Sequence, residues 1–402
     1  MTVEVRRCRD ETEYALALNG IWQYFSAPPT DEQLERFKSW IPFERMHAAF
    51  DGQEVVGGAG AAAFELSVPG GSLPCAGVTV VGVYPTHRRR GVLRELMRAQ
   101  LDDAHARGEP LAALWATEET IYGRFGYGMA SWVGEIELRR ESGGFARPVE
   151  RHGAVRFVEP AEAALLFPPL WDALRRQRPG VFSRTSEWWR TRPLRTPDEE
   201  KTKPRRYAVL EVDGDVRAYA VYKVDPGFES GVSTSTLEVV EAVGADPQAT
   251  AELWRFLIDI DLIATVKVRL VPPDHPLFML LANPRRARYR LGDGIWIRLV
   301  DVGSALAGRA YPGEESVVIE LRDEFCPWNA GRWSCGDGRA ERTEQAAELV
   351  LDADALGSAY LGAISFAQLR DGLRVEELVE GAVARADAIF GWRPLPWCPE
   401  IF

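Results

Sequence analysis

The sequence predicts a protein of mixed α/β and α+β structure that is divided into several domains. Its 402 residues exceed one ordinary domain, and two or three domains are usual at this length. The 46% of hydrophobic and 27% of charged residues are typical of a globular protein. Within about 60 residues, from 78 to 138, the pattern runs strand, loop, helix, strand, helix, strand, which indicates an α/β unit.

Three elements are expected before the loop of that unit. Residues 31–40 predict a short helix, and the glycine- and alanine-rich residues 54–68 predict a strand. The β-branched run at 78–83 has the length and composition of a buried strand. A loop over residues 84–90 follows it.

An amphipathic helix is expected over residues 91–107, and Gly108 ends it in the usual way. Its apolar residues recur at helical spacing with charged residues between them: Leu93, Leu96, Met97, Leu101 and Ala104. Three shorter elements are then expected, namely a buried strand over 111–116, a helix over 119–125 and a strand over 132–138.

Two polar stretches interrupted by glycine and proline predict the domain boundaries. The first covers residues 139–155 and the second covers residues 303–315. We therefore expect domains at residues 1–145, 146–303 and 304–402.

The middle domain repeats part of the first in weaker form. A strand over 237–243, a loop over 244–250 and a helix over 251–262 parallel the strand, loop and helix that begin at residue 78. The second loop has no arginine and contains Asp246 instead. A duplicated fold that lacks the basic loop of the first is therefore expected.

The last domain is expected to be an α+β module without a polar catalytic cluster of its own. A strand over 317–323 opens it, and the sequence Gly336-Asp337-Gly338 predicts a hairpin. Helices are expected over 354–363, 367–371 and 375–390.

Composition excludes several classes of function. The net charge of −11 argues against a nucleic-acid partner, because binding phosphates requires an excess of lysine and arginine. No segment reaches the roughly 18 apolar residues of a membrane helix, and the N-terminus has no apolar core of a signal peptide. We therefore expect a cytoplasmic protein without a membrane partner.

Metal and hydrolase chemistry are not expected either. The five cysteines and five histidines are scattered, so neither a disulfide framework nor a zinc site is predicted. Cys326 and Cys335 are the only near pair, and no second pair completes a ligand set. A G-x-S-x-G turn that would support a serine hydrolase is also missing from the sequence.

A basic, glycine-ended loop joins the strand at 78–83 to the following helix. The N–H groups and the dipole of a helix N-terminus bind pyrophosphate, and Arg88, Arg89 and Arg90 add charge-assisted hydrogen bonds. Gly91 lets the backbone approach phosphate closely. A solvated basic loop that only caps the helix is the alternative.

This loop resembles the pyrophosphate loop of the GNAT acyltransferase superfamily, which has the pattern Arg/Gln-x-x-Gly-x-Gly/Ala. Arg88 and Gly91 match its first two fixed positions, and Leu93 departs from the third. In that superfamily a tyrosine shortly before a glycine–aromatic pair protonates the departing thiolate of CoA. Tyr122 holds this position before Phe125-Gly126-Tyr127, and a side-chain pKa near 10 keeps such a tyrosine protonated. An ordinary core role is the alternative for Tyr122, and it is the one we adopt for Tyr127.

The sequences HRRRGVLRELM and IYGRFGYG, about 30 residues apart, are together similar to the enhanced-intracellular-survival (Eis) N-acetyltransferases of actinobacteria. The resemblance covers the whole chain. It implies two tandem GNAT-like domains, of which the second is degenerate, and a C-terminal domain similar to sterol carrier protein. The segment DADALGSAYLGAISFAQL resembles the helical part of that domain. It also implies acetyl-CoA as co-substrate, no metal, and a homohexamer that acetylates cationic amines such as aminoglycosides, or lysine side chains of proteins.

The same resemblance assigns the site residues. The strand end would bind the pantetheine arm, the loop and helix start would hold the phosphates, and two residues after the next strand would line the CoA site. These cofactor-binding residues are Val81, Gly82, Val83, Arg88, Arg89, Arg90, Gly91, Val92, Leu93, Arg94, Thr117 and Glu118. Tyr122 would be the general acid and the α-carboxylate of Phe402 the general base.

The final residues, 391–402, are aromatic and stiffened by proline, which suits a docked tail. An α-carboxylate is a weak base with a pKa of about 3.3–3.7, and burial would raise that pKa. A tail that only stabilises the last domain is the alternative.

The substrate is less defined. Asp31, Glu32, Glu35 and Phe37, with Glu400, are candidates for an acidic, aromatic-lined cleft that attracts a polycation. Acidic residues at a helix start are also ordinary capping, and residues 22–29 receive no assignment. Broad amine acceptance is expected.

Two rival functions stay open. The first is a non-catalytic protein that binds a lipid or acyl-CoA and regulates a partner. The second is an acyltransferase that takes longer acyl-CoAs.

Overall fold

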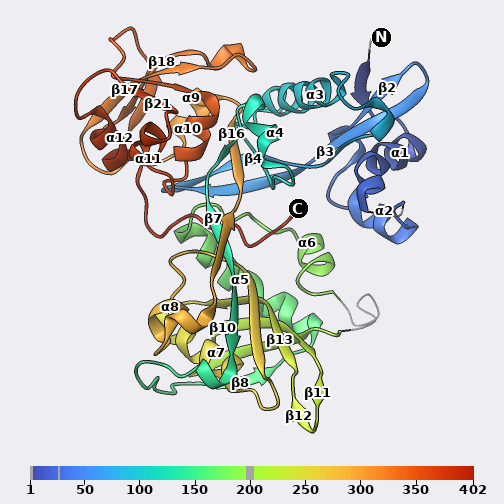
Figure 1. The fold of residues 1–402 in the computed structure, drawn as a ribbon, viewed down its shortest axis with the longest axis vertical. Coiled ribbons are helices and arrows are strands. Elements are labelled where there is room, and N and C mark those ends of the chain that lie inside the picture. Colours follow the sequence, from blue (N-terminus) through green and yellow to red (C-terminus); the bar gives the residue numbers. More distant parts are fainter. Residues whose placement is uncertain (1–2, 26–27, 196–202) are drawn as a thin grey trace. The chain divides into compact units, whose positions relative to one another are not determined.

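The computed structural model describes residues 3–25, 28–195 and 203–402 (Figure 1). The chain forms two compact units. Unit 1 comprises Met1–Ser131, Ile295–Arg393 and Ile401–Phe402, and unit 2 comprises Trp132–Gly294 and Pro394–Glu400. Among the helices of the described residues, none is both long and apolar enough to cross a lipid bilayer.

The larger sheet of unit 1 has seven strands in the order β1-β2-β3-β4-β5-β16-β6. Its neighbours are antiparallel except β4 and β5, which are parallel. The strands are β1 (Glu4–Arg7), β2 (Met46–Asp51), β3 (Glu54–Val68), β4 (Gly71–Val83), β5 (Leu111–Leu114), β16 (Trp296–Leu299) and β6 (Gly128–Met129). The helices beside them are α1 (Glu11–Trp22), α2 (Asp31–Lys38), α3 (Val92–Ala106) and α4 (Glu119–Tyr122).

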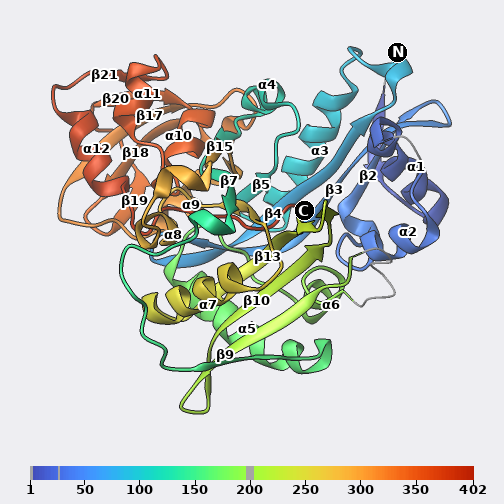
Figure 2. The same cartoon turned by 60° about the horizontal axis from the view of Figure 1, so that its bottom comes forward.

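Helices α1 and α3 cover opposite faces of this sheet, along β2, β3 and β4 (Figure 2). Ala48 of β2 packs in the cluster of α1, whereas its neighbour Ala49 packs in the cluster of α3. This is the two-residue alternation of a strand that is buried on both faces. The approach of α1 is close enough to require glycine, because a Cβ on Gly82 would lie 2.3 Å from the backbone nitrogen of Ile21.

Strand β4 has two irregularities that bear on the site. Its register with β3 shifts between Gly58 and Gly60, and Val80 has a φ of 49°, which together mark a β-bulge. Its pairing with β5 runs only from Cys75 to Gly77, although β4 continues to Val83. The two parallel strands therefore separate beyond Gly77.

Unit 1 also contains a five-stranded sheet in the order β19-β18-β17-β20-β21. Its strands are β17 (Ser316–Arg322), β18 (Gly331–Gly336), β19 (Arg339–Arg342), β20 (Leu349–Asp352) and β21 (Val375–Glu377). The helices of this part are α9 (Val302–Ala307), α10 (Ala353–Ala359), α11 (Phe366–Asp371) and α12 (Ala382–Phe390). The hairpin predicted at Gly336-Asp337-Gly338 is confirmed as the turn between β18 and β19.

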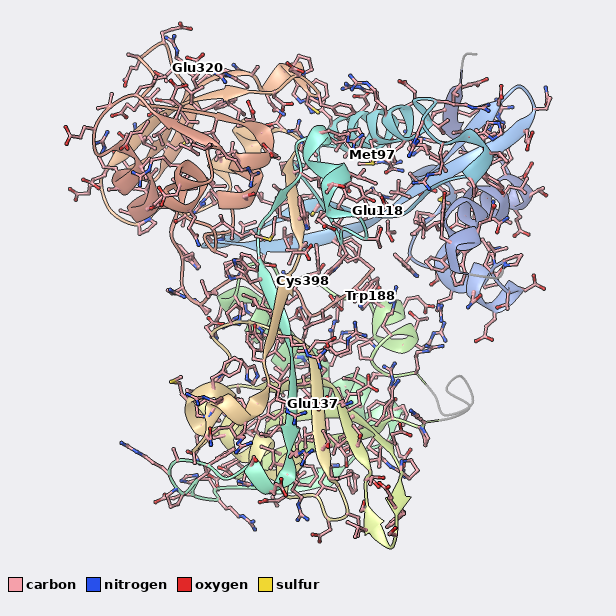
Figure 3. The ribbon with its side chains drawn as sticks, in the orientation of Figure 1. Met97, Glu118, Glu137, Trp188, Glu320 and Cys398 are labelled. Carbon is pink, nitrogen blue, oxygen red and sulfur yellow. The ribbon has the colours of Figure 1, made fainter. Side chains whose placement is uncertain are left out.

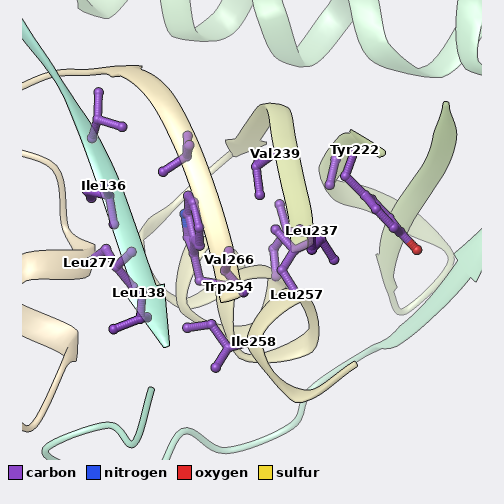
Figure 4. Packing of buried hydrophobic residues seen from close by; sticks show 14 of the residues in the cluster. Ile136, Leu138, Tyr222, Leu237, Val239, Trp254, Leu257, Ile258, Val266 and Leu277 are labelled. Carbon is purple, nitrogen blue, oxygen red and sulfur yellow. The ribbon is translucent and has the colours of Figure 1, made fainter. Parts of the chain in front are cut away.

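Unit 2 has a seven-stranded sheet in the order β15-β7-β14-β13-β10-β9-β8 and a separate pair, β11 and β12. The strands are β7 (Trp132–Arg139), β8 (Ala154–Phe157), β9 (Arg206–Val212), β10 (Asp215–Asp225), β11 (Phe228–Glu229), β12 (Val232–Ser233), β13 (Thr236–Gly244), β14 (Thr265–Val271) and β15 (Arg290–Asp293). The helices are α5 (Pro160–Gln177), α6 (Ser186–Thr191), α7 (Pro247–Asp259) and α8 (Leu277–Leu280). Trp254, Leu257 and Ile258 of α7 pack on the sheet in the core shown in Figure 4.

Several expected elements need correction. The strand expected over 132–138, placed in the first domain, is β7 and is hydrogen-bonded in the sheet of unit 2. The helix expected to begin at 251 begins at Pro247, because Asp246 caps it and proline suits its first position. The helix expected over 375–390 is instead the strand β21 followed by α12. The strand expected over 78–83 is the end of a longer strand, β4, that begins at Gly71. The other predicted helices and strands are confirmed within a few residues.

Candidate active site

A cavity of about 640 Å³ opens in unit 1 where β4 and β5 separate. Its wall combines the end of β4, the loop before α3, the start of α3 and the segment from Thr117 to Phe125. Met97 on α3 and Glu118 before α4 are labelled in Figure 3. Of the predicted cofactor-binding residues, all but Arg90 line this cavity: Val81, Gly82, Val83, Arg88, Arg89, Gly91, Val92, Leu93, Arg94, Thr117 and Glu118.

The bulge in β4 lies immediately before the part of the strand that lines the cavity. Bulged residues are not paired in the ladder, so their backbone polar groups are available to other partners. Because pairing with β5 ends at Gly77, Val81 and Val83 also face no strand on that side. This edge offers backbone hydrogen bonds to an extended ligand.

The first turn of α3 is open to an anion. Gly91 is the N-cap, has a φ of 86° and provides no side chain to cap the helix. A Cβ at Gly91 would meet nothing within 4 Å, so the left-handed backbone, not crowding, favours glycine there. The N–H groups of Val92, Leu93 and Arg94 have no partner within the helix, and the helix dipole favours negative charge beside them.

Four exposed arginines gather at the same cavity: Arg88, Arg89, Arg94 and Arg124. Among the residues that the structure describes, none of the four forms a salt bridge with a carboxylate. Glu118 is the one acidic residue among the lining residues. In a chain with a net charge of −11, this concentration of unpaired positive charge favours a polyanionic ligand such as a CoA phosphate.

Tyr122 is the last residue of α4 and lines the cavity. Only 8% of its surface is exposed, and its ring meets that of Tyr127 edge to face, with centroids 6.2 Å apart. Burial, with a smaller contribution from the charge of Glu118, raises the pKa of Tyr122 to about 12. The side chain is therefore protonated at neutral pH and is chemically able to donate a proton.

Phe402 lies on the sheet at the point where β4 and β5 separate. Its ring contacts that of Phe64, with centroids 5.2 Å apart, and a Cβ on Gly77 would lie 3.3 Å from its Cε2. Ala76 and Val78, the neighbours of Gly77, pack in the cluster that contains Met97 and Tyr122. Since side chains alternate along a strand, Phe402 lies on the face of the sheet opposite that cluster.

The acidic residues suggested for a substrate cleft do not line this cavity. Glu400, in unit 2, is buried, and its carboxylate accepts hydrogen bonds from Arg184 Nε (2.5 Å) and Trp188 Nε1 (2.6 Å). Asp31 and Glu32 lie in the first turn of α2 behind a capping box, and Glu35 pairs with Lys38. Glu400 thus fixes the C-terminal segment by its hydrogen bonds, and the acidic residues of α2 stabilise the helix in which they lie.

Several lining residues escaped the sequence reasoning: Ile21, Tyr24, His87, Thr120, Ile121, Arg124 and Phe125. Tyr24 follows α1 and donates a hydrogen bond to the carbonyl oxygen of Val83 (2.8 Å), so it closes one side of the cavity at the strand end. No periodicity marks it, because the contact joins residues far apart in the sequence. Arg124 could have been noticed as a cation beside Tyr122.

The family models assign a class to this architecture. Residues 4–130 and 180–299 each match a GNAT acetyltransferase domain, and residues 302–399 match a sterol carrier protein domain. The predicted fold class, two GNAT domains followed by a sterol-carrier-like domain, is confirmed. The protein is therefore a GNAT acetyltransferase, and that fold implies acetyl-CoA use.

Relatives narrow the class. An uncharacterized N-acetyltransferase of Streptomyces avermitilis is 37% identical over all of both chains. The N-acetyltransferase Eis of Mycobacterium tuberculosis is 36% identical over 84% of each chain. The crystal structure of Eis1 from Mycobacterium abscessus superposes with a TM-score of 0.88 and 30% identity, covering 99% of this chain and all of that one. The chain belongs to the Eis-like GNAT N-acetyltransferases, as the sequence had indicated.

A more distant structure shares the fold. The GCN5-related N-acetyltransferase from Anabaena variabilis has a TM-score of 0.86 at 21% identity and full coverage of both chains. The arrangement of the strands and helices thus persists where most side chains differ.

Proposed function

We propose that this N-acetyltransferase transfers the acetyl group of acetyl-CoA directly to a primary amine, with Tyr122 as general acid and the α-carboxylate of Phe402 as general base. The observation that carries the proposal is the separation of β4 from β5. At this point Tyr122 lies in the cluster on one face of the sheet, and Phe402 lies on the other face. A thioester held in this gap would have a proton donor and a proton acceptor on opposite sides.

The cofactor is assigned to the cavity described above. The N–H groups of Val92, Leu93 and Arg94, with Arg88 and Arg89, suit the diphosphate by charge and hydrogen-bonding capacity. Arg90 and Gly91 complete the loop. Val81, Gly82 and Val83 offer backbone groups to the pantetheine amides, and Thr117 and Glu118 line the side that follows β5.

The proposed transfer step is a direct displacement. The amine nitrogen, after its ammonium proton has passed to the carboxylate of Phe402 directly or through water, attacks the thioester carbon. A C–N bond forms, the C–S bond breaks, and Tyr122 gives its hydroxyl proton to the sulfur of CoA. The acetylated nitrogen then loses its remaining extra proton, which passes through water to the Tyr122 oxygen and restores the donor, and the proton on Phe402 is released to solvent. Because its pKa is about 12, Tyr122 is protonated at neutral pH, and it delivers its proton to the sulfur as negative charge develops there in the transition state.

The substrate class is proposed to be cationic amines: aminoglycoside-type polyamines, lysine side chains of proteins, or both. The support is membership of the Eis-like family together with the net negative charge, which attracts cations to the molecule. We further propose, from the family resemblance alone, a homohexamer that acts in the cytoplasm without a metal. Light scattering of the purified protein tests the hexamer.

The decisive assay follows thiol release from acetyl-CoA with a polyamine or an aminoglycoside as acceptor. Tyr122→Phe is expected to lower kcat by about 10²- to 10⁴-fold, the usual contribution of general acid–base catalysis. Converting the carboxylate of Phe402 to a carboxamide is expected to lower kcat similarly, because it removes the base and leaves the ring in place. The same chain with two residues added before Met1 is the control.

The outcomes separate the rival functions. Full activity of the carboxamide form would refute the terminal base. No turnover with any amine, but tight CoA binding, would favour a regulatory acyl-CoA- or lipid-binding protein. Faster turnover with longer acyl-CoAs would favour the broader acyltransferase.

A further inference from the structure

A buried arginine touches the segment that carries Tyr122. Arg298 lies in the middle of β16, opposite Ala112 of β5, and none of its surface is exposed. A Cβ on Gly126 would lie 2.1 Å from Nη1 of Arg298 and 2.7 Å from its Cζ. The guanidinium thus fills the space where a side chain at position 126 would stand.

Gly126 ends the turn that begins at Tyr122. Its φ of 80° is left-handed, so both the backbone conformation and the guanidinium require glycine there. Its N–H donates to the carbonyl oxygen of Gly123 (2.9 Å), and the N–H of Tyr127 donates to that of Tyr122 (3.3 Å). Through these two hydrogen bonds, a shift of the Gly126 backbone also shifts the backbone of Tyr122, which lies in the same turn.

The guanidinium is itself held by the sterol-carrier-like part of the chain. Its Nη2 donates to Oδ2 of Asp323 at 2.5 Å, and Asn329 Nδ2 donates to the same oxygen at 3.1 Å. The other carboxylate oxygen of Asp323 accepts from the backbone N–H of Cys326 (2.9 Å). Phe325, from the same loop, packs edge to face on Phe125, with centroids 5.1 Å apart.

Stability alone does not account for this arrangement. A buried ion pair gains little over apolar side chains of the same volume, because both charges lose their hydration. Nε and Nη1 of Arg298 and the hydroxyl of Tyr127 are also buried without a hydrogen bond to nitrogen or oxygen among the described residues, and the Cys326 thiol is a weak further partner of the guanidinium. Unsatisfied buried donors cost free energy, so a role other than stabilisation is indicated.

We propose that Arg298, fixed by Asp323, is a positioning residue that sets the orientation of the Tyr122 side chain by holding the Gly126–Tyr127 backbone. This inference rests on the proposed role of Tyr122. It assigns a task to the sterol-carrier-like part of the chain, which supplies Asp323 and thereby supports the catalytic segment. Arg298 does not line the cavity, so its loss is expected to affect kcat more than cofactor affinity.

The test compares Arg298→Met with Arg298→Lys and Asp323→Asn. Methionine keeps an unbranched apolar stem and removes the guanidinium, and is expected to lower kcat by about 10- to 100-fold, the effect of displacing a catalytic group by about 1 Å. The dissociation constant of CoA, measured by calorimetry, should change less than about twofold, within ordinary context effects at a distant site. Lysine should restore part of kcat, and Asp323→Asn should lower it in the same direction.

Arg309→Met is the matched control. Arg309 is also buried in unit 1, but it donates to the carbonyl oxygens of Tyr360 and Phe390 and has no part in the Gly126 turn. Its loss is expected to lower the melting temperature without lowering kcat, when each enzyme is assayed where circular dichroism shows it folded. A similar loss of kcat in both methionine variants would overturn the positioning role.

A double substitution separates this inference from the proposed function. In the Tyr122→Phe background, Arg298→Met should cause no further loss of kcat, since the two act through one proton transfer. Additive losses would refute the inference and leave Tyr122 as the acid. Unchanged kcat in Tyr122→Phe alone would refute the acid, and with it the inference.

Discussion

Two strand–loop–helix segments of the same kind differ in how the N-terminus of the helix is capped. In unit 1, β4 leads through a basic loop to α3, whose N-cap is Gly91 and whose first N–H groups have no side-chain cap. In unit 2, β13 leads to α7, where the carboxylate of Asp246 accepts from the N–H of Ala249 and Pro247 removes another N–H. One helix end is open to an anion and the other is closed by its own acid.

The charges around the two helix ends follow the same division. Arg88, Arg89 and Arg94 form no salt bridge among the described residues, whereas Arg217 pairs with Asp246 at 2.6 Å. Capping chemistry, not the fold, therefore decides which of two related segments is a candidate phosphate site.

The largest effect is expected from closing the open end. Gly91→Asp should raise the KM for acetyl-CoA by about 100-fold, because a carboxylate would both cap the N–H groups and repel phosphate. Steady-state kinetics checks this. Gly91→Ala introduces the same backbone strain without the charge, and it should raise the KM for acetyl-CoA by only about tenfold. Equal effects of the two would show that charge is irrelevant at this helix end.

Removing one arginine should have an intermediate effect. Arg88→Ala is expected to raise the KM for acetyl-CoA by about tenfold, the equivalent of one charge-assisted hydrogen bond. The difference from the wild type should shrink as salt rises, because these side chains are exposed. Arg217→Ala, in the closed counterpart, should leave KM unchanged, and an equal rise there would argue against a local phosphate site.

Removing the Asp246 cap from the N-terminus of α7 should affect stability alone. Asp246→Ala removes a helix cap and is expected to cost about 0.5–2 kcal/mol, seen as a lower midpoint of urea unfolding with kcat and KM unchanged. Hydrogen bonds from the N–H of Ala249 and from Arg217 lower the pKa of Asp246. This stabilisation is complete above the unfolded carboxyl pKa of about 3.9 and is lost as pH falls through the lower folded pKa. The variant and the wild type should therefore converge in acid, and a constant difference at low pH would contradict the capping role.

The smallest effect is expected from raising the pH of the assay. Because burial raises the pKa of Tyr122 to about 12, the acid stays protonated below pH 10. The kcat should therefore rise with pH as the amine substrate and the α-carboxyl of Phe402 lose protons. No descending limb is expected up to pH 10. A descending limb near pH 9 in the wild type, missing from Tyr122→Phe, would show that Tyr122 titrates within the working range.

The sequence was sufficient for what depends on neighbours along the chain. The run at 78–83, the amphipathic spacing of α3 and the turn at Gly336-Asp337-Gly338 are local signals, and each was confirmed. The family resemblance added Tyr122 and Phe402 as candidates, and their roles stay predictions. The segment expected as a helix from 375 failed because three residues of β21 carry too short a pattern to separate strand from helix.

Contacts between distant residues could not be predicted in this way. Tyr24 reaches Val83 only because α1 crosses β4, and Arg298 reaches Gly126 only because β16 inserts between β5 and β6. Glu400, a candidate for the substrate cleft in the sequence, is instead buried in unit 2 beside Arg184. Such pairings depend on the tertiary fold and leave no local pattern.

The place of β16 in the first sheet has a consequence for biosynthesis. This strand pairs with both β5 and β6, so the sheet that holds the cavity stays incomplete until residue 299 has left the ribosome. Pairing across so long a stretch of chain is slow to form, and β5 exposes an unpaired edge in the meantime. Shortened translation products that end before β16 should therefore aggregate or be degraded, so that a partly made chain cannot accumulate as a loose acetyl-CoA binder.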